Sequence, residues 1–190
     1  MKNKLIDSIE KSSVTLKLFA ISIVLQIICS IFPDFTEFLA FNIHNPLFPL
    51  QLITYQLAHG SWSHLLGNWS FGIIFMLYSE HKLGKKKFLE SYLLCGLGAV
   101  IMQMCMNGPD GLLIGSSGSI FGLACLSCFI YGNKPIEKIL AFCFFLSMFM
   151  PQVIMASFSM IMPTGIAYAG HVGGGMMAIL LTRFLSKKSS

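Results

Sequence analysis

The run GSSGSIFGLACLSCFIY, residues 115–131, places hydroxyl groups directly before a long apolar segment. Its composition predicts a membrane-embedded helix that begins near Ser117. The N-terminus of a helix presents free N–H groups and a partial positive charge, which would stabilise an oxyanion formed beside Ser117. Gly115 and Gly118 would let other backbone approach closely. Ser117 is therefore a candidate nucleophile, while the alternative is that this cluster of small residues serves helix packing alone.

The chain as a whole has the composition of a polytopic membrane protein. Of its 190 residues, 55% are hydrophobic and only 11% are charged, and the mean hydropathy is +0.73. These values exclude an ordinary soluble domain and predict one membrane domain over residues 1–190. No small-residue cleavage site follows the first apolar run at Ile31, so we expect that run to stay in the protein as a helix.

Apolar runs separated by prolines predict an all-α bundle of six membrane-spanning helices. The expected spans are residues 16–31, 65–78, 88–106, 117–131, 139–161 and 171–185. The connection before the second span, residues 32–63, is long and partly apolar. We therefore expect it to lie in the membrane interface.

The basic residues predict how this bundle is oriented. All 13 lie near the two ends of the chain or in the second and fourth connections between spans. Because cytoplasmic segments retain Lys and Arg, both termini are expected in the cytoplasm. The net charge of +5 then follows from membrane orientation and does not require a nucleic-acid partner. Glu80 and Lys82, at the cytoplasmic end of the second span, are expected to form a structural polar cluster.

Four polar side chains are predicted to lie at one depth in the membrane: His64, Asn68, Ser117 and His171. They lie 14 to 18 residues before the cytoplasmic lysines that follow their spans. At ~1.5 Å per helical residue, this places them ~20 to 27 Å above the inner edge of a core of ~30 Å. A polar side chain within the membrane is energetically costly, so their shared depth indicates a polar cavity that opens to the outside.

These four residues have complementary chemical roles. His171 could take the proton of Ser117, and no carboxylate lies at this depth, so the expected pair is a Ser-His dyad. His64 and Asn68, four residues apart on one helical face, would donate hydrogen bonds to an oxyanion together with backbone N–H groups near Ser117. Small residues at intervals of four would let the fourth and sixth spans pack closely: Gly118, Gly122, Gly170, Gly174 and Ala178. The competing interpretation is that the histidines and the asparagine are hydrogen-bond partners between helices.

The six cysteines lie in or beside apolar runs, where cysteine acts as a small hydrophobic residue. Cys125 and Cys128 form a CxxC pair, but no His or carboxylate is near them in sequence. Neither a metal site nor a redox site nor a disulfide framework is expected.

Taken in order, the motifs resemble those of the rhomboid intramembrane serine proteases. His59 and residues 64–68 resemble the His-rich entry to the family's second span, and residues 80–84 are similar to its Glu-x-Arg-x-Gly element. Residues 115–118 match the Gly-x-Ser-Gly nucleophile motif, and residues 170–174 resemble the Ala-His-x-x-Gly of the sixth span. The resemblance extends over all six expected helices, as in the compact bacterial members of the family.

This resemblance implies a protease that cleaves a transmembrane segment of a single-span or polytopic membrane-protein substrate near its extracytoplasmic end. It implies no cofactor, a bacterial-type inner membrane as the location, and residues 139–169 as a lateral gate and cap. It assigns Ser117 and His171 as the catalytic dyad and His64 and Asn68 as oxyanion donors.

Three features depart from the family pattern without removing a catalytic group. Leu50 and Gln51 stand in place of a Trp-Arg pair, and Lys82 replaces an Arg. Phe121 stands where a Tyr often stacks on the catalytic His, and a Phe ring can still stack there.

Two other functional classes are alternatives to a protease. One is a rhomboid-like protein that binds membrane clients without cutting them, which the intact set of four residues disfavours. The other is a small transporter, which would need polar residues through the full depth of the membrane. A narrower version of the protease is a sorting-type rhomboid that trims C-terminal Gly-rich anchors.

Overall fold

The computed structural model describes residues 13–45, 47–108, 112–130, 134–161 and 165–186, and every regular element in these ranges is an α-helix. The helices are α2 (Ser13–Ile31), α3 (Asp34–Leu39), α4 (Phe48–Thr54), α5 (Trp62–Leu83), α6 (Lys85–Asn107), α7 (Ser117–Ile130), α8 (Pro135–Ser159) and α9 (Tyr168–Ser186). The all-α class is confirmed. Each expected span overlaps one of the six longer helices, and the connection expected at the interface contains the short helices α3 and α4.

Capping residues determine where the helices begin and end, and these capping residues lie outside the apolar runs. The Ser61 side chain accepts a hydrogen bond from the backbone N–H of His64 at 3.1 Å, so α5 begins earlier than its apolar run. Gly84, with a φ of +77°, ends α5 and turns the chain into α6. Pro135 begins α8, where its missing N–H costs no helical hydrogen bond. Hydropathy alone therefore misses the polar ends of these helices.

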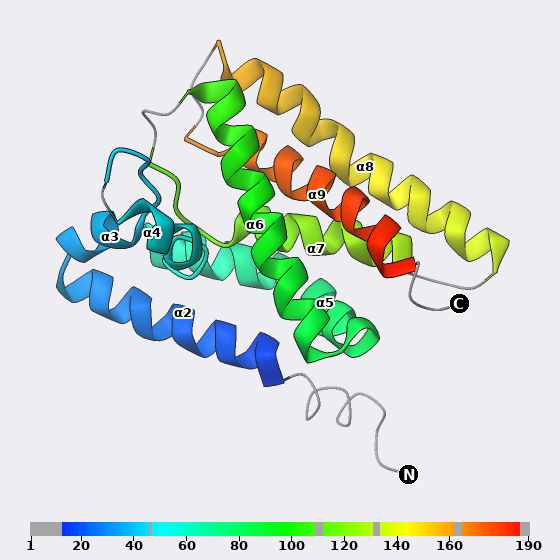
Figure 1. Ribbon diagram of the computed structural model, residues 1–190, viewed down its shortest axis with the longest axis horizontal. Coiled ribbons are helices and arrows are strands. Elements are labelled where there is room, and N and C mark those ends of the chain that lie inside the picture. The colour runs from blue at the N-terminus through cyan, green and yellow to red at the C-terminus, as the bar shows by residue number, and fades with distance from the viewer. Residues whose placement is uncertain (1–12, 46, 109–111, 131–133, 162–164, 187–190) are drawn as a thin grey trace.

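The centre of the bundle is formed by α6, α7 and α9, with α2 and α8 on opposite sides of this group (Figure 1). α7 contacts α5, α6, α8 and α9, and its residues from Gly118 to Ser127 are all buried. The start of α2, the α5–α6 connection, the start of α8 and the end of α9 lie toward the lower centre and right of Figure 1. α3 and α4 lie at the other end, beside the connection that leads into α7.

Glycines allow the close contacts between the central helices. A Cβ atom on Gly174 of α9 would collide with the carbonyl oxygen of Gly118 of α7, and one on Gly122 would lie 2.7 Å from the carbonyl oxygen of Gly174. A Cβ atom on Gly98 of α6 would lie 2.7 Å from the carbonyl oxygen of Gly173. Larger residues are excluded at these positions, so the backbones of α6, α7 and α9 lie in direct contact.

The hydroxyl groups of two tyrosines form hydrogen bonds between the bundle and the segment that contains α3 and α4. The Tyr55 hydroxyl donates to the carbonyl oxygen of Gly96 at 2.7 Å, and the Tyr92 hydroxyl donates to that of Gln56 at 2.8 Å. Gln51, at one of the positions that depart from the family pattern, is buried and donates to the Phe38 carbonyl oxygen at 2.9 Å. The segment is thus held by hydrogen bonds that do not require a Trp-Arg pair.

Glu80 has a structural role that differs from the expected cluster with Lys82. Its carboxylate accepts hydrogen bonds from the N–H groups of Val14 and Thr15 at 3.0 and 2.8 Å, and from the Thr15 hydroxyl at 2.7 Å. Lys82 lies instead over the ring of Tyr78, at 5.6 Å from its centroid. Glu80 of α5 therefore caps the N-terminus of α2, where free N–H groups favour a negative charge.

Three of the described helices are long and apolar enough to cross a membrane: Val14–Ile31, Lys85–Asn107 and Pro135–Ser159. The remaining long helices, α5 and α9, carry buried polar residues or several glycines, and α7 has only 14 residues. α5, α7 and α9 are thus less suited to cross a membrane by length and hydropathy. These three helices carry the candidate site residues His64, Asn68, Ser117 and His171.

Candidate active site

Ser117 begins α7 at the end of a short stretch of irregular backbone. Before it, Leu113 pairs with Phe41 through two backbone hydrogen bonds of 2.8 and 3.1 Å, and the N–H of Gly115 donates to the carbonyl oxygen of Tyr55 at 2.8 Å. Gly115 has a φ of +114°, a conformation that residues with a side chain rarely adopt. Leu113, Gly115 and Ser116 of this connection are buried, whereas Leu112 before them is exposed. The irregular backbone next to Ser117 is therefore covered by protein.

Three serines lie at the start of α7, and they differ in whether their hydroxyl groups are bonded. Ser116 and Ser119 are fully buried. The Ser116 hydroxyl lies 3.1 Å from Nε2 of His59, and the Ser119 hydroxyl donates to Oε1 of Gln56 at 2.8 Å. Ser117 is half-buried, and its hydroxyl forms no hydrogen bond with any residue that the structure describes. Of the three, Ser117 is the serine whose hydroxyl is free to react.

His59, in the connection before α5, holds the backbone in front of Ser117. Its Nε2 lies 3.4 Å from the backbone nitrogen of Ser116, and its ring meets the ring of His64 edge-on at 5.1 Å. Burial, with a smaller contribution from His64, lowers the pKa of His59 to about 4. The ring is therefore neutral at pH 7, and Nε2 can accept a hydrogen bond from the Ser116 N–H.

His64 and Asn68, on consecutive turns of α5, both approach the backbone of Gly115. A Cβ atom on Gly115 would lie 2.9 Å from Nε2 of His64 and 3.5 Å from Nδ2 of Asn68. The Asn68 amide nitrogen is buried and has no hydrogen-bond partner within the described part of the chain. A buried donor without an acceptor is unusual in a folded protein, and it suits an oxyanion that forms only during a reaction.

His171 lies in the first turn of α9, which faces the start of α7. The Phe121 ring stacks on the imidazole with centroids 5.6 Å apart and planes 19° apart. Gly118 follows Ser117, and a Cβ atom on it would lie 3.4 Å from the carbonyl oxygen of Gly170, which precedes His171. The structure thus brings Ser117 and His171 to neighbouring positions on two helices in contact.

The His171 ring is bonded to α8 and not to Ser117. Its Nδ1 lies 2.8 Å from Oε1 of Gln152, and no hydrogen bond joins it to Ser117 in the described structure. Hydrogen bonds between catalytic groups are often long before substrate binds, so adjacency without a bond is compatible with a dyad.

Gln152 was not among the residues predicted for the site, although the sequence contains a signal for it. It lies 14 residues after Lys138, near the start of its helix, and so ~21 Å along the helix axis from it. With Lys138 at the expected inner edge, this equals the depth expected for His64, Asn68, Ser117 and His171. Those depths follow from spans expected to run inward, whereas α8 belongs to a span expected to run outward.

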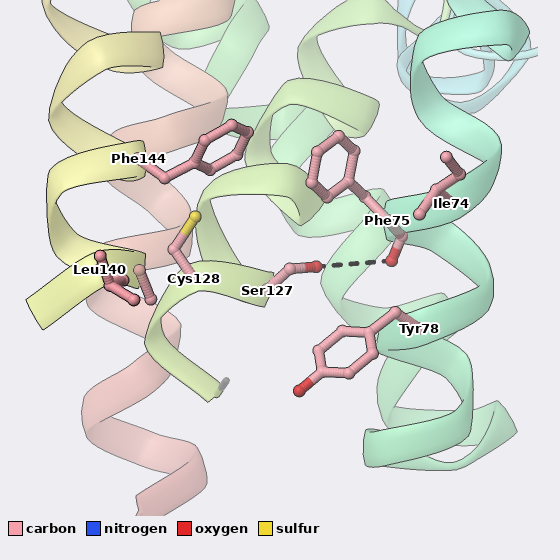
Figure 2. Close-up of a pocket in the computed structure, with 8 residues that line it drawn as sticks. Ile74, Phe75, Tyr78, Ser127, Cys128, Leu140 and Phe144 are labelled. Carbon is pink, nitrogen blue, oxygen red and sulfur yellow. Dashed lines mark hydrogen bonds between the residues drawn. The ribbon is translucent and has the colours of Figure 1, made fainter. Parts of the chain in front are cut away.

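In the described part of the chain, cavities lie beside the site helices at two places, and neither of these cavities is lined by Ser117 or His171. One, of about 440 Å³, lies where α6 and α8 end and α9 begins, and Gln103, Asn107 and Ser159 line it. The other is a lateral apolar groove of about 370 Å³ between α5 and α8, with α7 behind it (Figure 2). Phe75 of α5 and Phe144 of α8 face each other across this groove with ring centroids 6.2 Å apart. The expected polar cavity around Ser117 is neither of these two.

Comparison with known proteins decides the family. Residues 49–188, which contain every site residue described above, match the Rhomboid domain family. The chain belongs to the rhomboid family. Over 147 residues this rhomboid is 26% identical to Rhomboid-like protein 11, chloroplastic, of Arabidopsis thaliana, and the alignment covers 72% of this chain and 52% of that relative. This rhomboid thus spans about half the length of the relative that it matches.

Family membership confirms the resemblance and gives the function at a coarse level. Proteins of the rhomboid family are intramembrane proteases, typically serine proteases, or inactive homologues of them. Together with the apolar helices, this makes the rhomboid described here an integral membrane protein.

Proposed function

We propose that this protein is an intramembrane serine endopeptidase that cleaves transmembrane segments of membrane-protein substrates near their extracytoplasmic end. The observation that supports this most strongly is the free, half-buried hydroxyl of Ser117 at the start of α7. Donor groups of His64 and Asn68 lie beside the backbone of Gly115, two residues before it. His171 is the base on the neighbouring helix, next to Phe121.

The chemistry follows from these positions. His171 accepts the proton of the Ser117 hydroxyl through Nε2 while the serine oxygen attacks the carbonyl carbon of the substrate. The negative charge on the substrate oxygen is stabilised by the N–H of Ser117 and by the side chains of His64 and Asn68. When the C–N bond breaks, the imidazolium donates its proton to the leaving amine. Water then attacks the acyl-enzyme with His171 again as the base, which releases the acid and restores Ser117.

We place the protein in a bacterial-type inner membrane as one membrane domain with six spans and both termini in the cytoplasm. The support is the distribution of basic residues, since Lys17, Lys85, Lys134 and Arg183 belong to helix ends or connections that lie toward one end of the bundle. Ser117 and His171 then lie toward the extracytoplasmic side. A substrate helix would enter from the lipid bilayer between α5 and α8, whose ends nearer the cytoplasm are separated by the apolar lateral groove.

The test is cleavage of a single-span substrate by the purified protein in liposomes, with product masses that locate the cut. We expect Ser117→Ala and His171→Ala to lower the cleavage rate at least about 1000-fold, because each removes a group that takes part in bond breaking. Ser119→Ala is the matched control, since it removes a hydroxyl on the same helix that is bonded to Gln56. Cleavage that persists in a folded Ser117→Ala variant would exclude Ser117 as the nucleophile.

The alternative is an inactive rhomboid-family protein that binds membrane clients. It would be favoured if the parent protein bound several single-span substrates and cut none of them. A sorting-type protease, the narrower version, would cut substrates with C-terminal Gly-rich anchors and leave other single-span substrates intact.

A further inference from the structure

Gln152 lies within an apolar stretch of α8 and directs its amide at the ring of His171. It follows Pro151, is half-buried, and its Oε1 lies 2.8 Å from Nδ1 of His171. A polar side chain in a membrane helix is costly unless it has a partner. The partner of Gln152 is the residue that we propose as the catalytic base.

This contact determines which ring nitrogen of His171 carries the proton. A carboxamide oxygen can only accept a hydrogen bond, so Nδ1 of His171 is the donor. A neutral imidazole with its hydrogen on Nδ1 has its lone pair on Nε2. Nε2 is the nitrogen that would take the proton of Ser117.

A second contact from α8 supports the same ring. Phe149, one turn before Gln152, lies with its ring centroid 6.3 Å from that of Phe121, and Phe121 stacks on His171 at 5.6 Å. Tyr168 of α9 meets the imidazole edge-on at 6.1 Å. No carboxylate is bonded to His171 in the described part of the chain, so Gln152 occupies the place that an acidic residue has in a catalytic triad.

We propose that Gln152 is a positioning residue for His171, a role that rests on the proposed protease function. It holds the tautomer with hydrogen on Nδ1 and directs Nε2 toward Ser117. A neutral amide does this without the cost of burying a carboxylate in the membrane. Because Gln152 belongs to α8, His171 is oriented as a base only while α8 lies against α9.

The kinetic test compares two substitutions at this position with a control on the same helix. Gln152→Met keeps the length of the side chain and removes the acceptor, so kcat should fall about 10- to 100-fold with KM changed less than about 3-fold. Gln152→Glu keeps an acceptor and should hold kcat within about 10-fold of the parent. The control is Ser157→Ala, which removes an exposed hydroxyl bonded only to the Val153 carbonyl oxygen of α8 itself.

The pH profile separates positioning of the base from a purely structural role. A carboxylate at position 152 would stabilise the imidazolium form of His171, so a higher pH would be needed to keep the base neutral. The acid limb of the kcat/KM profile should therefore move to higher pH in Gln152→Glu and stay in place in Ser157→Ala. An unchanged acid limb, or a loss that lies entirely in KM, would overturn the positioning role.

A spectroscopic test does not depend on activity. ¹⁵N-histidine NMR in detergent micelles, with the His171 signals identified by their loss in His171→Ala, should report the tautomer with hydrogen on Nδ1 in the parent. In Gln152→Met, the population with hydrogen on Nε2 should rise. The same tautomer in both proteins would overturn the proposal, even if the parent cleaves substrate. If the parent cleaves nothing and the tautomer shifts as expected, the protease function fails while the contact stands.

Discussion

Asn68 is the residue at which the catalytic and structural interpretations predict opposite results. Its amide nitrogen is buried and has no partner among the described residues, and it lies beside Gly115, where the oxyanion would form. As a hydrogen-bond partner between helices, it would stabilise the fold. As an oxyanion donor, it would lower the stability of the resting protein, because its buried amide nitrogen has no acceptor there. It would gain an acceptor only during the reaction.

We therefore expect Asn68→Ala to lower kcat about 10- to 1000-fold with little change in KM, because a donor that acts in the transition state is lost. The thermal midpoint in detergent should stay the same or rise, since an unsatisfied buried amide is removed. Both quantities are measured on the same preparation. A lower midpoint with unchanged kcat would identify Asn68 as a structural residue and remove it from the site.

At the scale of elements, α2 depends on another helix for its N-terminal cap. Glu80 of α5 accepts hydrogen bonds from the N–H groups of Val14 and Thr15 and from the Thr15 hydroxyl. Such a cap satisfies free N–H groups at the start of α2 and joins the first and second long helices. One carboxylate thus adds a hydrogen-bonded link between α2 and α5 to their packing, in which the ring centroids of Phe19 and Trp69 lie 4.5 Å apart.

Glu80→Gln should lower the stability of the protein by about 1–3 kcal/mol, because an amide replaces a charged acceptor of several buried hydrogen bonds. Thermal unfolding in detergent measures the effect. Glu90→Gln is the control, since Glu90 is exposed on α6 and should change stability by less than about 0.5 kcal/mol. Equal midpoints for the two variants would contradict the role of Glu80 as a cap. Catalytic parameters at low temperature should be unchanged in both, because neither residue lies near Ser117.

At the scale of the whole molecule, the basic residues and the arrangement of the helices predict one orientation. A fluorescent protein fused after residue 188 should fluoresce, and a periplasmic phosphatase fused there should be inactive, because the C-terminus is expected in the cytoplasm. The same pair of reporters inserted near residue 45, between α3 and α4, should give the opposite result. Matching results at both positions would contradict the proposed orientation.

Much of the fold could be predicted from the sequence because hydropathy and proline positions report membrane helices directly. The apolar runs gave the six longer helices, while their ends depend on caps such as Ser61, which hydropathy does not detect. Glu80 could be recognised as polar, but its hydrogen bonds to Val14 and Thr15 join segments far apart in the chain. Partners of this kind depend on tertiary packing, which one sequence does not specify.

The candidate site could be predicted from short motifs and residue spacing, and not from hydropathy. Ser117, His171, His64 and Asn68 belong to short motifs and are expected at one depth, so the sequence alone associates them. Their surroundings could not be derived in the same way. The bond from Gln152 to His171 and the free hydroxyl of Ser117 beside two bonded serines both depend on which helix faces which.

The central place of α9 has a consequence for how the protein is made. α9 is synthesised last among the described helices, yet it packs against both α6 and α7 through Gly173 and Gly174. α7, with 14 residues, is ~21 Å long and shorter than a bilayer core of ~30 Å, so it depends on neighbours for burial. Until α9 has been synthesised, the surfaces of α6 and α7 that contact it in the folded protein therefore remain uncovered. A chain that terminates before residue 168 lacks α9 and leaves the glycine-lined contact surfaces of α6 and α7 uncovered.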